Sequence, residues 1–391
     1  MNAQIVKKKD NYYIAMEWYE KGERKTKTIS VRKYLGLNRR AKWKEANAVL
    51  HKVMEEQRQG IFIEPSSILL GDFILEWVEN HKHNIKPTTF CSYNNFIENH
   101  IVPGLGNIPL SKLRPSQIKA FYNKKLKEGR ADGKPGGLSN RSVRYIHTIL
   151  GAALDSAVED ELIPRNVVKV VTPPAPVKPK IKYWEWGKAK QFLESTKQDR
   201  YHIFYLIALS TGMARGEILG LRWKDVNWKK QTLSVQQTIV NLDTGPIIQL
   251  STKTENRQRT LDISSALINK LKTYKKQQSE EMLALGNKNK KGLIFITQKD
   301  TFLRPRDIDT YFEKSINRFN KNCKKEHEKL QKISSHGLRH TYATHLLEEG
   351  VHPKIVSERL GHAGIQITLD TYSHVAPRLQ KEIAKLTDDL L

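Results

Sequence analysis

Apolar residues recur at helical spacing over most of residues 68–171. In the first of these stretches, Phe73, Ile74, Trp77 and Val78 fall on one side of a helix. Threonine or serine stands at the start of two later stretches, as is typical of helix N-caps. The pattern therefore predicts a small all-helical bundle. Its helices are expected over residues 70–81, over 88–101 with Thr88 as the cap, over 115–128, and over 139–159 with Ser139 as the cap.

The first 60 residues follow a different pattern. Residues 11–19 alternate between apolar and polar side chains, which places Tyr12, Ile14, Met16 and Trp18 on one face of a strand. Further elements are expected as a turn at residues 21–23, a strand over 25–31 and a helix over 41–59. A short sheet on which aromatic and basic side chains mix is suited to contacts with a DNA groove.

Helices and short strands alternate in the C-terminal half. Alternating segments over residues 232–240, 247–251 and 258–263 predict one small antiparallel sheet. Helices are expected over residues 184–195 and 201–211, from His336 to a stop at Gly350, from Pro353 to Leu360, and in a last turn capped by Thr368. The whole chain is therefore predicted to be α+β, with a sheet-plus-helix N-terminal domain, a helical bundle and a mainly helical C-terminal domain.

Prolines are concentrated in the segment TPPAPVKPKIK, residues 172–182. Proline at this density favours an extended, semi-rigid connector. We therefore expect three domains, over residues 1–64, 65–172 and 183–391, with the connector at residues 173–182.

The chain carries 67 Lys and Arg against 41 Asp and Glu, for a formal net charge of +26. Such an excess indicates a polyanionic partner. The sequence has no run of about 18 apolar residues, so nucleic acid is favoured over a membrane. Cys91 and Cys323 are too few for a disulfide framework or a cysteine-based zinc site. These features predict a cytoplasmic protein that binds nucleic acid.

Arginine, histidine and a phenol are concentrated between Ser335 and His374, where they include His336, Arg339 and Tyr372. A guanidinium binds a phosphate diester through paired hydrogen bonds, and an imidazole exchanges protons near neutral pH. A phenol oxygen can act as a nucleophile. The set suits attack on a phosphodiester.

Two other interpretations of this segment are weaker. His336 and His340 have the spacing of zinc ligands, but no Glu lies between them and Arg339 would repel a cation. Residues 347–364 fit a helix-turn-helix, yet the segment that would read the groove, IQITLDTY, carries Asp370 and neither Lys nor Arg.

Several sequence boxes occur in order along the last half of the chain. They are ALSTGMARGEILGLRWKDVNW, STKTENRQRTLDI, HGLRH, LGHAG and TLDTYSH. At these spacings they resemble the signature of the tyrosine recombinase (phage integrase) family, which includes integrases of temperate phages and conjugative transposons. The resemblance implies a site-specific recombinase that integrates and excises a mobile element. It also implies an arm-type DNA-binding domain at residues 1–64, a core-binding domain at 65–172 and a catalytic domain at 183–391.

The resemblance gives roles to five residues. Tyr372 attacks the scissile phosphate to give a 3′-phosphotyrosine and a free 5′ hydroxyl, and a second strand's 5′ hydroxyl reverses the step, so neither metal nor ATP is required. Arg339 stabilises the transition state and His336 acts in proton transfer. His362 hydrogen-bonds the phosphate, and Lys253 protonates the departing 5′ oxygen.

The same resemblance implies partners. They are double-stranded DNA with core and arm attachment sites, further copies of the chain in a tetramer on DNA, an excisionase and a host DNA-bending protein. The amphipathic C-terminal tail is expected to dock on a neighbouring subunit. Duplex contacts are expected from Arg141, Arg144, Arg215, Arg304 and His340.

One position departs from the family pattern. The first box of the family reads Thr-Gly-x-Arg-x-Gly-Glu, whereas Ala214 follows Met213 here and Arg215 comes one residue later. Arg215 is not expected to substitute, because one step along a helix turns a side chain by about 100°. Catalysis is therefore expected to be impaired or absent. The sequence leaves open whether Ala214 is natural or introduced.

Two other classes of protein also stay open. A type IB topoisomerase uses the same chemistry to relax supercoils, although the arm-like N-terminal unit argues against it. A DNA-binding regulator without catalytic activity fits Ala214.

Overall fold

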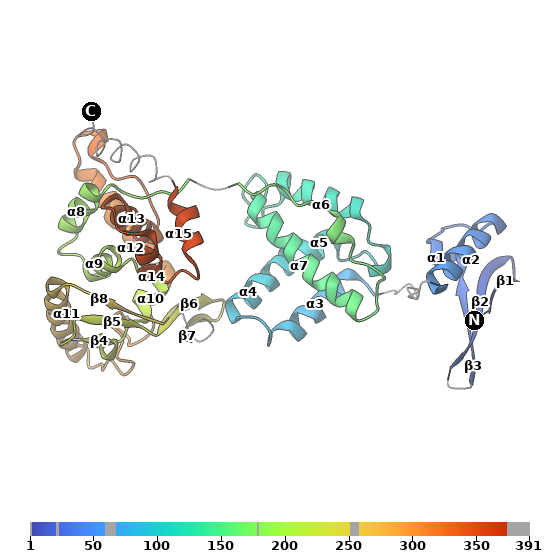
Figure 1. Cartoon of the computed structure of the whole chain (residues 1–391), viewed down its shortest axis with the longest axis horizontal. Helices are drawn as coiled ribbons and strands as arrows, with labels where there is room; N and C mark the ends of the chain where they lie inside the picture. The colour runs from blue at the N-terminus through green and yellow to red at the C-terminus, as the bar shows by residue number, and fades with distance from the viewer. Residues whose placement is uncertain (1, 21–22, 59–67, 178–179, 251–257, 374–391) are drawn as a thin grey trace, which may run out of the picture. The chain divides into compact units, whose positions relative to one another are not determined.

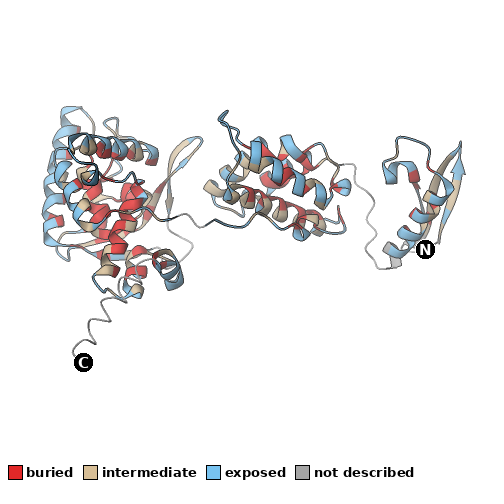
Figure 2. Cartoon of the chain, turned by 90° about the horizontal axis from the view of Figure 1, so that it is seen from above, coloured by how far each residue is buried: buried red, intermediate tan, exposed pale blue. Residues whose placement is uncertain are grey.

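The computed structural model describes residues 2–20, 23–58, 68–177, 180–250 and 258–373. The chain divides into two compact units, Met1–Lys178 and Pro179–Leu391. Figure 1 labels their helices and strands. Buried residues line the inner faces of the helices and sheets within these units (Figure 2). Helices and small antiparallel sheets are both present, which confirms the predicted α+β class. Within the described ranges, no helix is long and apolar enough to cross a bilayer.

An antiparallel sheet of order β1-β2-β3 opens the chain. Ile5 of β1 pairs with Ile14 of β2, which pairs in turn with Ile29 of β3. Ile14 and Met16 are buried in the core that the sheet shares with the helices after it. The face predicted to hold Ile14 and Met16 together is thus the core face. The elements are β1 (Asn2–Lys8), β2 (Asn11–Glu20), β3 (Glu23–Ser30), α1 (Val31–Leu35) and α2 (Trp43–Arg58).

The edge strand β1 was absent from the sequence prediction. Ala3 and Ile5 of this strand pack against the core, but Val6 interrupts the alternation and the segment ends in Lys7 and Lys8, so the pattern is weak. Lysines of this kind are common on edge strands, because they discourage pairing with another chain. The strand depends on its pairing with β2, which local sequence does not reveal.

The segment after residue 68 forms the predicted helical bundle. Its apolar faces meet in one core that includes Trp77, Ile118 and Leu150. The Ser139 hydroxyl accepts a hydrogen bond from the Ser142 N–H at 3.1 Å, so Ser139 is the predicted N-cap. The main helices are α3 (Leu70–His81), α4 (Pro87–Phe96), α5 (Val102–Leu105), α6 (Pro115–Glu128) and α7 (Asn140–Glu159).

The helix predicted over residues 88–101 differs in two respects. It begins at Pro87 with Lys86 as the N-cap, so the prediction of Thr88 as the cap was wrong. Proline suits the first helical position because it has no N–H to leave unpaired there. The last part of the predicted helix, Ile97–Ile101, is a π-helix.

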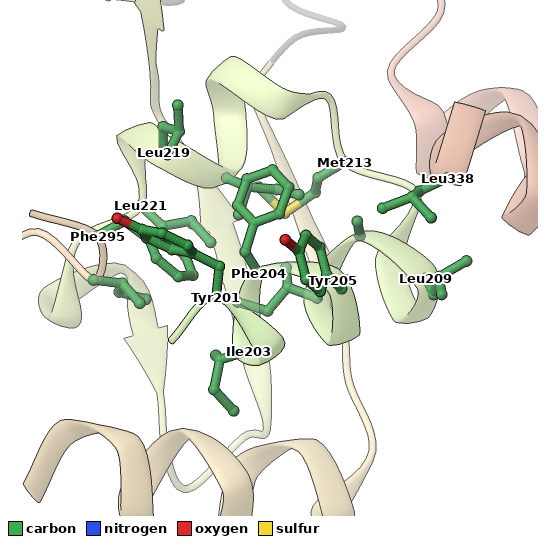
Figure 3. Packing of buried hydrophobic residues seen from close by; sticks show 14 of the residues in the cluster. Tyr201, Ile203, Phe204, Tyr205, Leu209, Met213, Leu219, Leu221, Phe295 and Leu338 are labelled. Atoms are coloured by element: carbon green, nitrogen blue, oxygen red, sulfur yellow. The ribbon is translucent and has the colours of Figure 1, made fainter. Parts of the chain in front are cut away.

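The helix α9 lies at the centre of the C-terminal unit. Phe204, Tyr205 and Leu209 are buried in the core of this unit, together with Met213 and Leu338 (Figure 3). This packing sets residues 208–228, the first sequence box and hereafter the arginine box, against the helix that carries HGLRH. The helices are α8 (Trp186–Ser195), α9 (His202–Thr211), α10 (Arg215–Gly220), α11 (Ser265–Ala284), α12 (Pro305–Asn322), α13 (Ser335–Glu348), α14 (Pro353–Leu360) and α15 (Ile365–Tyr372).

The single sheet predicted for this half was wrong, because its strands form two sheets. The predicted strand over residues 232–240 breaks at Gln236. The Gln237 side chain then donates to the carbonyl of Gly220 at 2.8 Å, which ties the second piece to α10. One sheet contains β4 (Val226–Asn227), β5 (Thr232–Val235) and β8 (Arg259–Asp262), and the other contains β6 (Gln237–Leu242) and β7 (Gly245–Leu250).

Candidate active site

Three consecutive helices carry most of the predicted chemistry. α13 bears His336, Arg339 and His340 in its first turns. α14 ends at Gly361, whose φ of 72° lies in the left-handed region that favours glycine. A Cβ at this position would also lie 2.6 Å from Nη1 of Arg259. Gly361 therefore allows the chain to turn directly beside a charged side chain.

Thr368 does not cap α15, contrary to the prediction. The helix begins at Ile365 after Gly364, about one turn earlier than expected. Thr368 is instead buried inside the unit, and its hydroxyl forms a hydrogen bond of 2.8 Å with Nδ1 of His362. Its role is to hold the imidazole of the LGHAG box.

Arg339 joins two of the sequence boxes. Its Nη1 donates to the carbonyl of Gly212 at 3.0 Å, and its Nη2 donates to the carbonyl of Leu360 at 2.7 Å. The residue is only 7% exposed. Burial lowers the pKa of Arg339 from its usual value, while Glu217 acts in the opposite direction. Arginine stays protonated in proteins, so a fixed cation lies between the arginine box and the LGHAG box.

A buried ion pair joins the arginine box to β8, the strand that follows the segment of Lys253. Arg259 donates from Nη1 and Nη2 to the two carboxylate oxygens of Glu217 at 3.0 and 2.9 Å. Its Nε donates to the carbonyl of Arg359 at 2.7 Å. Burial acts to raise the pKa of the Glu217 carboxyl, but the hydrogen bonds and charge of Arg259 outweigh it and the pKa is lowered. The sequence analysis missed Arg259, although its place within STKTENRQRTLDI was a signal.

Tyr372 lies against α13. Its hydroxyl forms a hydrogen bond of 2.9 Å with Nδ1 of His340, and the His340 ring stands edge-on to that of His336 at 4.8 Å between centroids. Tyr372 is 3% exposed. Burial raises the pKa of Tyr372 to about 12, although the charge of Arg339 acts against the shift. The phenol is therefore protonated at neutral pH.

The two histidines beside Arg339 are neutral at neutral pH. Burial, followed by the charges of Arg339 and Arg259, lowers the pKa of His362 to about 4. Burial, followed by the charges of Arg339 and Arg215, also lowers the pKa of His336. A neutral imidazole has one donor and one acceptor nitrogen, so each ring can pass on a proton or bind an oxygen.

The sequence matches the phage integrase family over residues 187–378. It also matches the phage integrase N-terminal SAM-like domain over residues 69–126. It is 30% identical over 367 residues to the tyrosine recombinase XerC-like protein of Caldanaerobacter subterraneus subsp. tengcongensis, and the match covers 89% of this chain and 90% of that protein. The chain belongs to the phage integrase family.

Two further proteins are similar to this integrase-family chain. It is 30% identical over 349 residues to the ICEBs1 integrase of Bacillus subtilis, with 89% of each protein covered. Its fold is similar to that of the Tn1549 transposon integrase in complex with a circular intermediate DNA. That match has a TM-score of 0.65 at 21% identity and covers 81% of this chain and 100% of the other.

Ala214 stands at the N-cap of α10 in this integrase-family chain. Its backbone N–H donates to the Glu217 carboxylate at 2.8 Å, and Gly212, two residues earlier, is bonded to Arg339. The backbone of the arginine box is thus fixed on both sides of the position that departs from the family pattern. The side chain at that position contributes only a methyl group.

Arg215 is directed to α12, where its guanidinium forms an ion pair with Asp309. The same carboxylate accepts a hydrogen bond from the Ser335 hydroxyl at 2.5 Å. The ion pair of Arg215 and Asp309 is therefore bonded to the first residue of α13. The charge of Arg215 contributes to the lowered pKa of His336. The guanidinium of Arg215 is therefore paired with Asp309 beside the site.

The other predicted contact residues lie in different surroundings. Arg144 donates from Nη1 to the carbonyl of Pro174 at 3.1 Å, which ties residues of the proline-rich segment to α7. Arg304 forms an exposed ion pair with Asp307, and Arg141 is exposed on α7. Lys253 lies outside the described residues, so its predicted role stays a prediction.

Proposed function

We propose that this chain is a site-specific DNA recombinase that moves a mobile element by strand exchange through a 3′-phosphotyrosine at Tyr372. The observation that carries the proposal is the position of Arg339. Its guanidinium is bonded to Gly212 and Leu360 and lies close enough to Tyr372 to act on its pKa. Segments far apart in the sequence thus converge on one buried cation and one phenol, as attack on a phosphodiester requires.

Each neighbouring side chain has a part in the proposed reaction. The Tyr372 oxygen attacks the phosphorus while Arg339 stabilises the charge on the non-bridging oxygens. His362 donates a hydrogen bond to the same phosphate, and His336 takes part in proton transfer. Lys253 protonates the 5′ oxygen as it leaves.

We further propose that Ala214 keeps cleavage slow. The family pattern has an arginine at this position, and a methyl group can neither donate a hydrogen bond nor neutralise charge. The domains are assigned as an arm-type DNA-binding domain at residues 1–64, a core-binding domain at 65–172 and a catalytic domain at 183–391. Attachment-site DNA is the proposed partner, together with an excisionase and a host DNA-bending protein.

A DNA duplex nicked close to the cleavage point tests this function. The short fragment that carries the 5′ hydroxyl diffuses away after cleavage, so the strand cannot be rejoined and the covalent adduct accumulates. The adduct is expected after Ala214→Arg and is expected to disappear when Tyr372→Phe is added. If it persists without the phenol oxygen, another residue is the nucleophile and the proposal fails.

Ala214 also favours a second candidate function, a DNA-binding regulator without catalytic activity. Apart from the side chain at position 214, the arginine box keeps an ordered backbone, because Glu217 and Arg339 form hydrogen bonds with it. The two functions are separated by the Ala214→Arg variant. A regulator that has lost further parts of the site would bind attachment DNA yet form no adduct in that variant.

We expect specific and salt-sensitive duplex binding in spite of Ala214. The net charge of +26 spreads phosphate contacts over many side chains, so one missing arginine removes a small share of them. Affinity should fall on the order of 10³-fold between about 50 and 200 mM salt, if six or more phosphates are neutralised. A gel-shift titration at several salt concentrations measures this, and a flat response would contradict it.

The C-terminal tail is proposed to join subunits on DNA. Its apolar residues Leu379, Ile383, Leu386 and Leu390 have helical spacing, and all lie outside the described residues. The protomer is expected to be monomeric alone and to form a tetramer on two DNA sites. Deleting residues 378–391 should abolish cooperative pairing of two sites while single-site affinity stays the same. Pairing that survives the deletion would show that other surfaces hold the subunits together.

A further inference from the structure

His340 is placed to act on the nucleophile directly. Its Nδ1 lies 2.9 Å from the Tyr372 hydroxyl oxygen, which is hydrogen-bonding distance. The two ring centroids are 5.8 Å apart with the planes inclined at 62°. This arrangement aims a ring nitrogen at the hydroxyl. The contact joins the first turns of α13 to the end of α15.

The proton on this hydroxyl is an obstacle to the proposed reaction. Burial raises the pKa of Tyr372 to about 12, so the phenolate is scarce at neutral pH. A phenol that attacks phosphorus must lose its proton during the step, and a base within hydrogen-bonding distance speeds this transfer. His340 meets that requirement in the structure.

His340 also lines a pocket of about 650 Å³ on the side of α13 that faces α12. The charged side chains around this pocket are Lys180, Lys182, Asp309, Glu313 and Lys332. Of these, Lys332 forms an ion pair with Glu313, and Asp309 is paired with Arg215. The neutral ring of His336 stands against His340 from the same helix. The His340 ring therefore borders a pocket whose rim carries several charged side chains.

We propose that His340 is a catalytic residue of this chain, whose Nδ1 takes the proton of the Tyr372 hydroxyl as the phenol oxygen attacks the scissile phosphate. The inference rests on the proposed recombinase function and assigns the transfer of the Tyr372 proton to His340, not to His336. His340 was expected to contact DNA, and its position against the nucleophile gives it a different task.

The step balances in atoms and charge. The Tyr372 Oη–H bond breaks, its proton goes to His340 Nδ1, and a new bond forms between Oη and the phosphorus. The bond between phosphorus and the 5′ oxygen breaks, and that oxygen takes a proton from the general acid proposed above, Lys253. In the reverse step the His340 imidazolium returns its proton to Oη as the tyrosine leaves.

The first test uses the chain as it is, without DNA. Nitrogen NMR of histidine-labelled protein distinguishes the two neutral tautomers, and His340→Gln assigns the signal. We expect Nδ1 of His340 to carry no proton and to accept from Tyr372, so Tyr372→Phe should shift its resonance. A proton on Nδ1 would make His340 the donor and would overturn the proposal.

The second test measures cleavage in the Ala214→Arg background. His340→Ala should slow adduct formation by about 10²- to 10⁴-fold, the usual contribution of a general base. The remaining rate should rise with pH, because hydroxide then removes the phenol proton. A side chain that only supports the fold would give a loss that does not depend on pH. His345→Ala is the matched control, since His345 lies on the same helix but stacks on Trp186.

The outcomes separate this inference from the proposed function. Adduct formation at an unchanged rate in His340→Ala, together with its loss in Tyr372→Phe, would overturn the role of His340 and leave the recombinase intact. A large loss of rate that is the same at every pH would also overturn it. If Ala214→Arg forms no adduct at all, the proposed function fails and the inference fails with it. Within the Ala214→Arg background, equal DNA affinity of His340→Ala, His345→Ala and Tyr372→Phe serves as the check that these variants are folded.

Discussion

Replacing Ala214 with arginine should raise the rate of covalent adduct formation by at least about 10²- to 10³-fold, the usual value of one preorganised donor in a transition state. A charged, bidentate donor can contribute more. The backbone that would carry the new arginine is already fixed, because Glu217 binds the Ala214 N–H and Arg339 binds the carbonyl of Gly212. The rate is measured on a nicked duplex by denaturing gel electrophoresis.

A graded series at the same position separates charge from geometry. Ala214→Lys restores a charge but not a planar pair of donors, so it should recover part of the rate. Ala214→Gln restores neither a charge nor a guanidinium and should recover little. If the chain with Ala214 already forms the adduct as fast as the arginine variant, then Arg215 or another group supplies the missing charge.

Replacing Arg259 with methionine should destabilise the C-terminal unit by about 3 to 5 kcal/mol, because it leaves a buried carboxylate without its partner. The Arg259 and Glu217 side chains are 8% and 16% exposed, and their bonds are the link between β8 and α10. Calorimetry of the full chain measures the shift of the unfolding transition. The double change Arg259→Met with Glu217→Leu should recover much of the loss, since no charge is then left buried.

The exposed pair of Arg304 and Asp307 provides the control for that experiment. The Arg304 side chain is 63% exposed, and its ion pair spans three residues at the start of α12. Exposed pairs are screened by water and contribute little. Arg304→Met should therefore leave the unfolding transition almost unchanged. Equal shifts for Arg259→Met and Arg304→Met would contradict the importance given to the buried pair.

Local signals were sufficient for most of the helical bundle, although not for the limits of α4. The limits of α3 and α6 agree with the predicted ranges, and Ser139 caps α7 as expected. Periodicity, a proline at the first helical position and a serine cap are all features that neighbouring residues determine. These signals are present in the sequence before any tertiary contact forms.

Three of the errors share a physical cause, which is dependence on contacts that the local residue pattern does not show. β1 is held by β2, and the break between β5 and β6 follows from the bond between Gln237 and Gly220. Thr368 has a typical N-cap side chain, but its hydroxyl is committed to His362. A cap or strand preference is weak beside such contacts, so composition alone gave the wrong element or limit.

The residues of the candidate site also fall into two groups, those that the sequence predicted and those that only the structure revealed. The boxes single out His336, Arg339 and Tyr372 because residue types and spacings are visible along the chain. The partners that organise them are not visible there, since Arg259 is 42 residues from Glu217 and His340 is 32 residues from Tyr372. Only the folded chain shows that these pairs meet.

The residue that becomes joined to DNA tests the central claim most directly. The adduct formed by Ala214→Arg can be digested with protease and nuclease, and the peptide that carries a nucleotide can be sequenced by mass spectrometry. We predict a single modified residue, Tyr372, linked through its oxygen to a 3′ phosphate. A nucleotide on any other residue, or a linkage to a 5′ phosphate, would contradict the account.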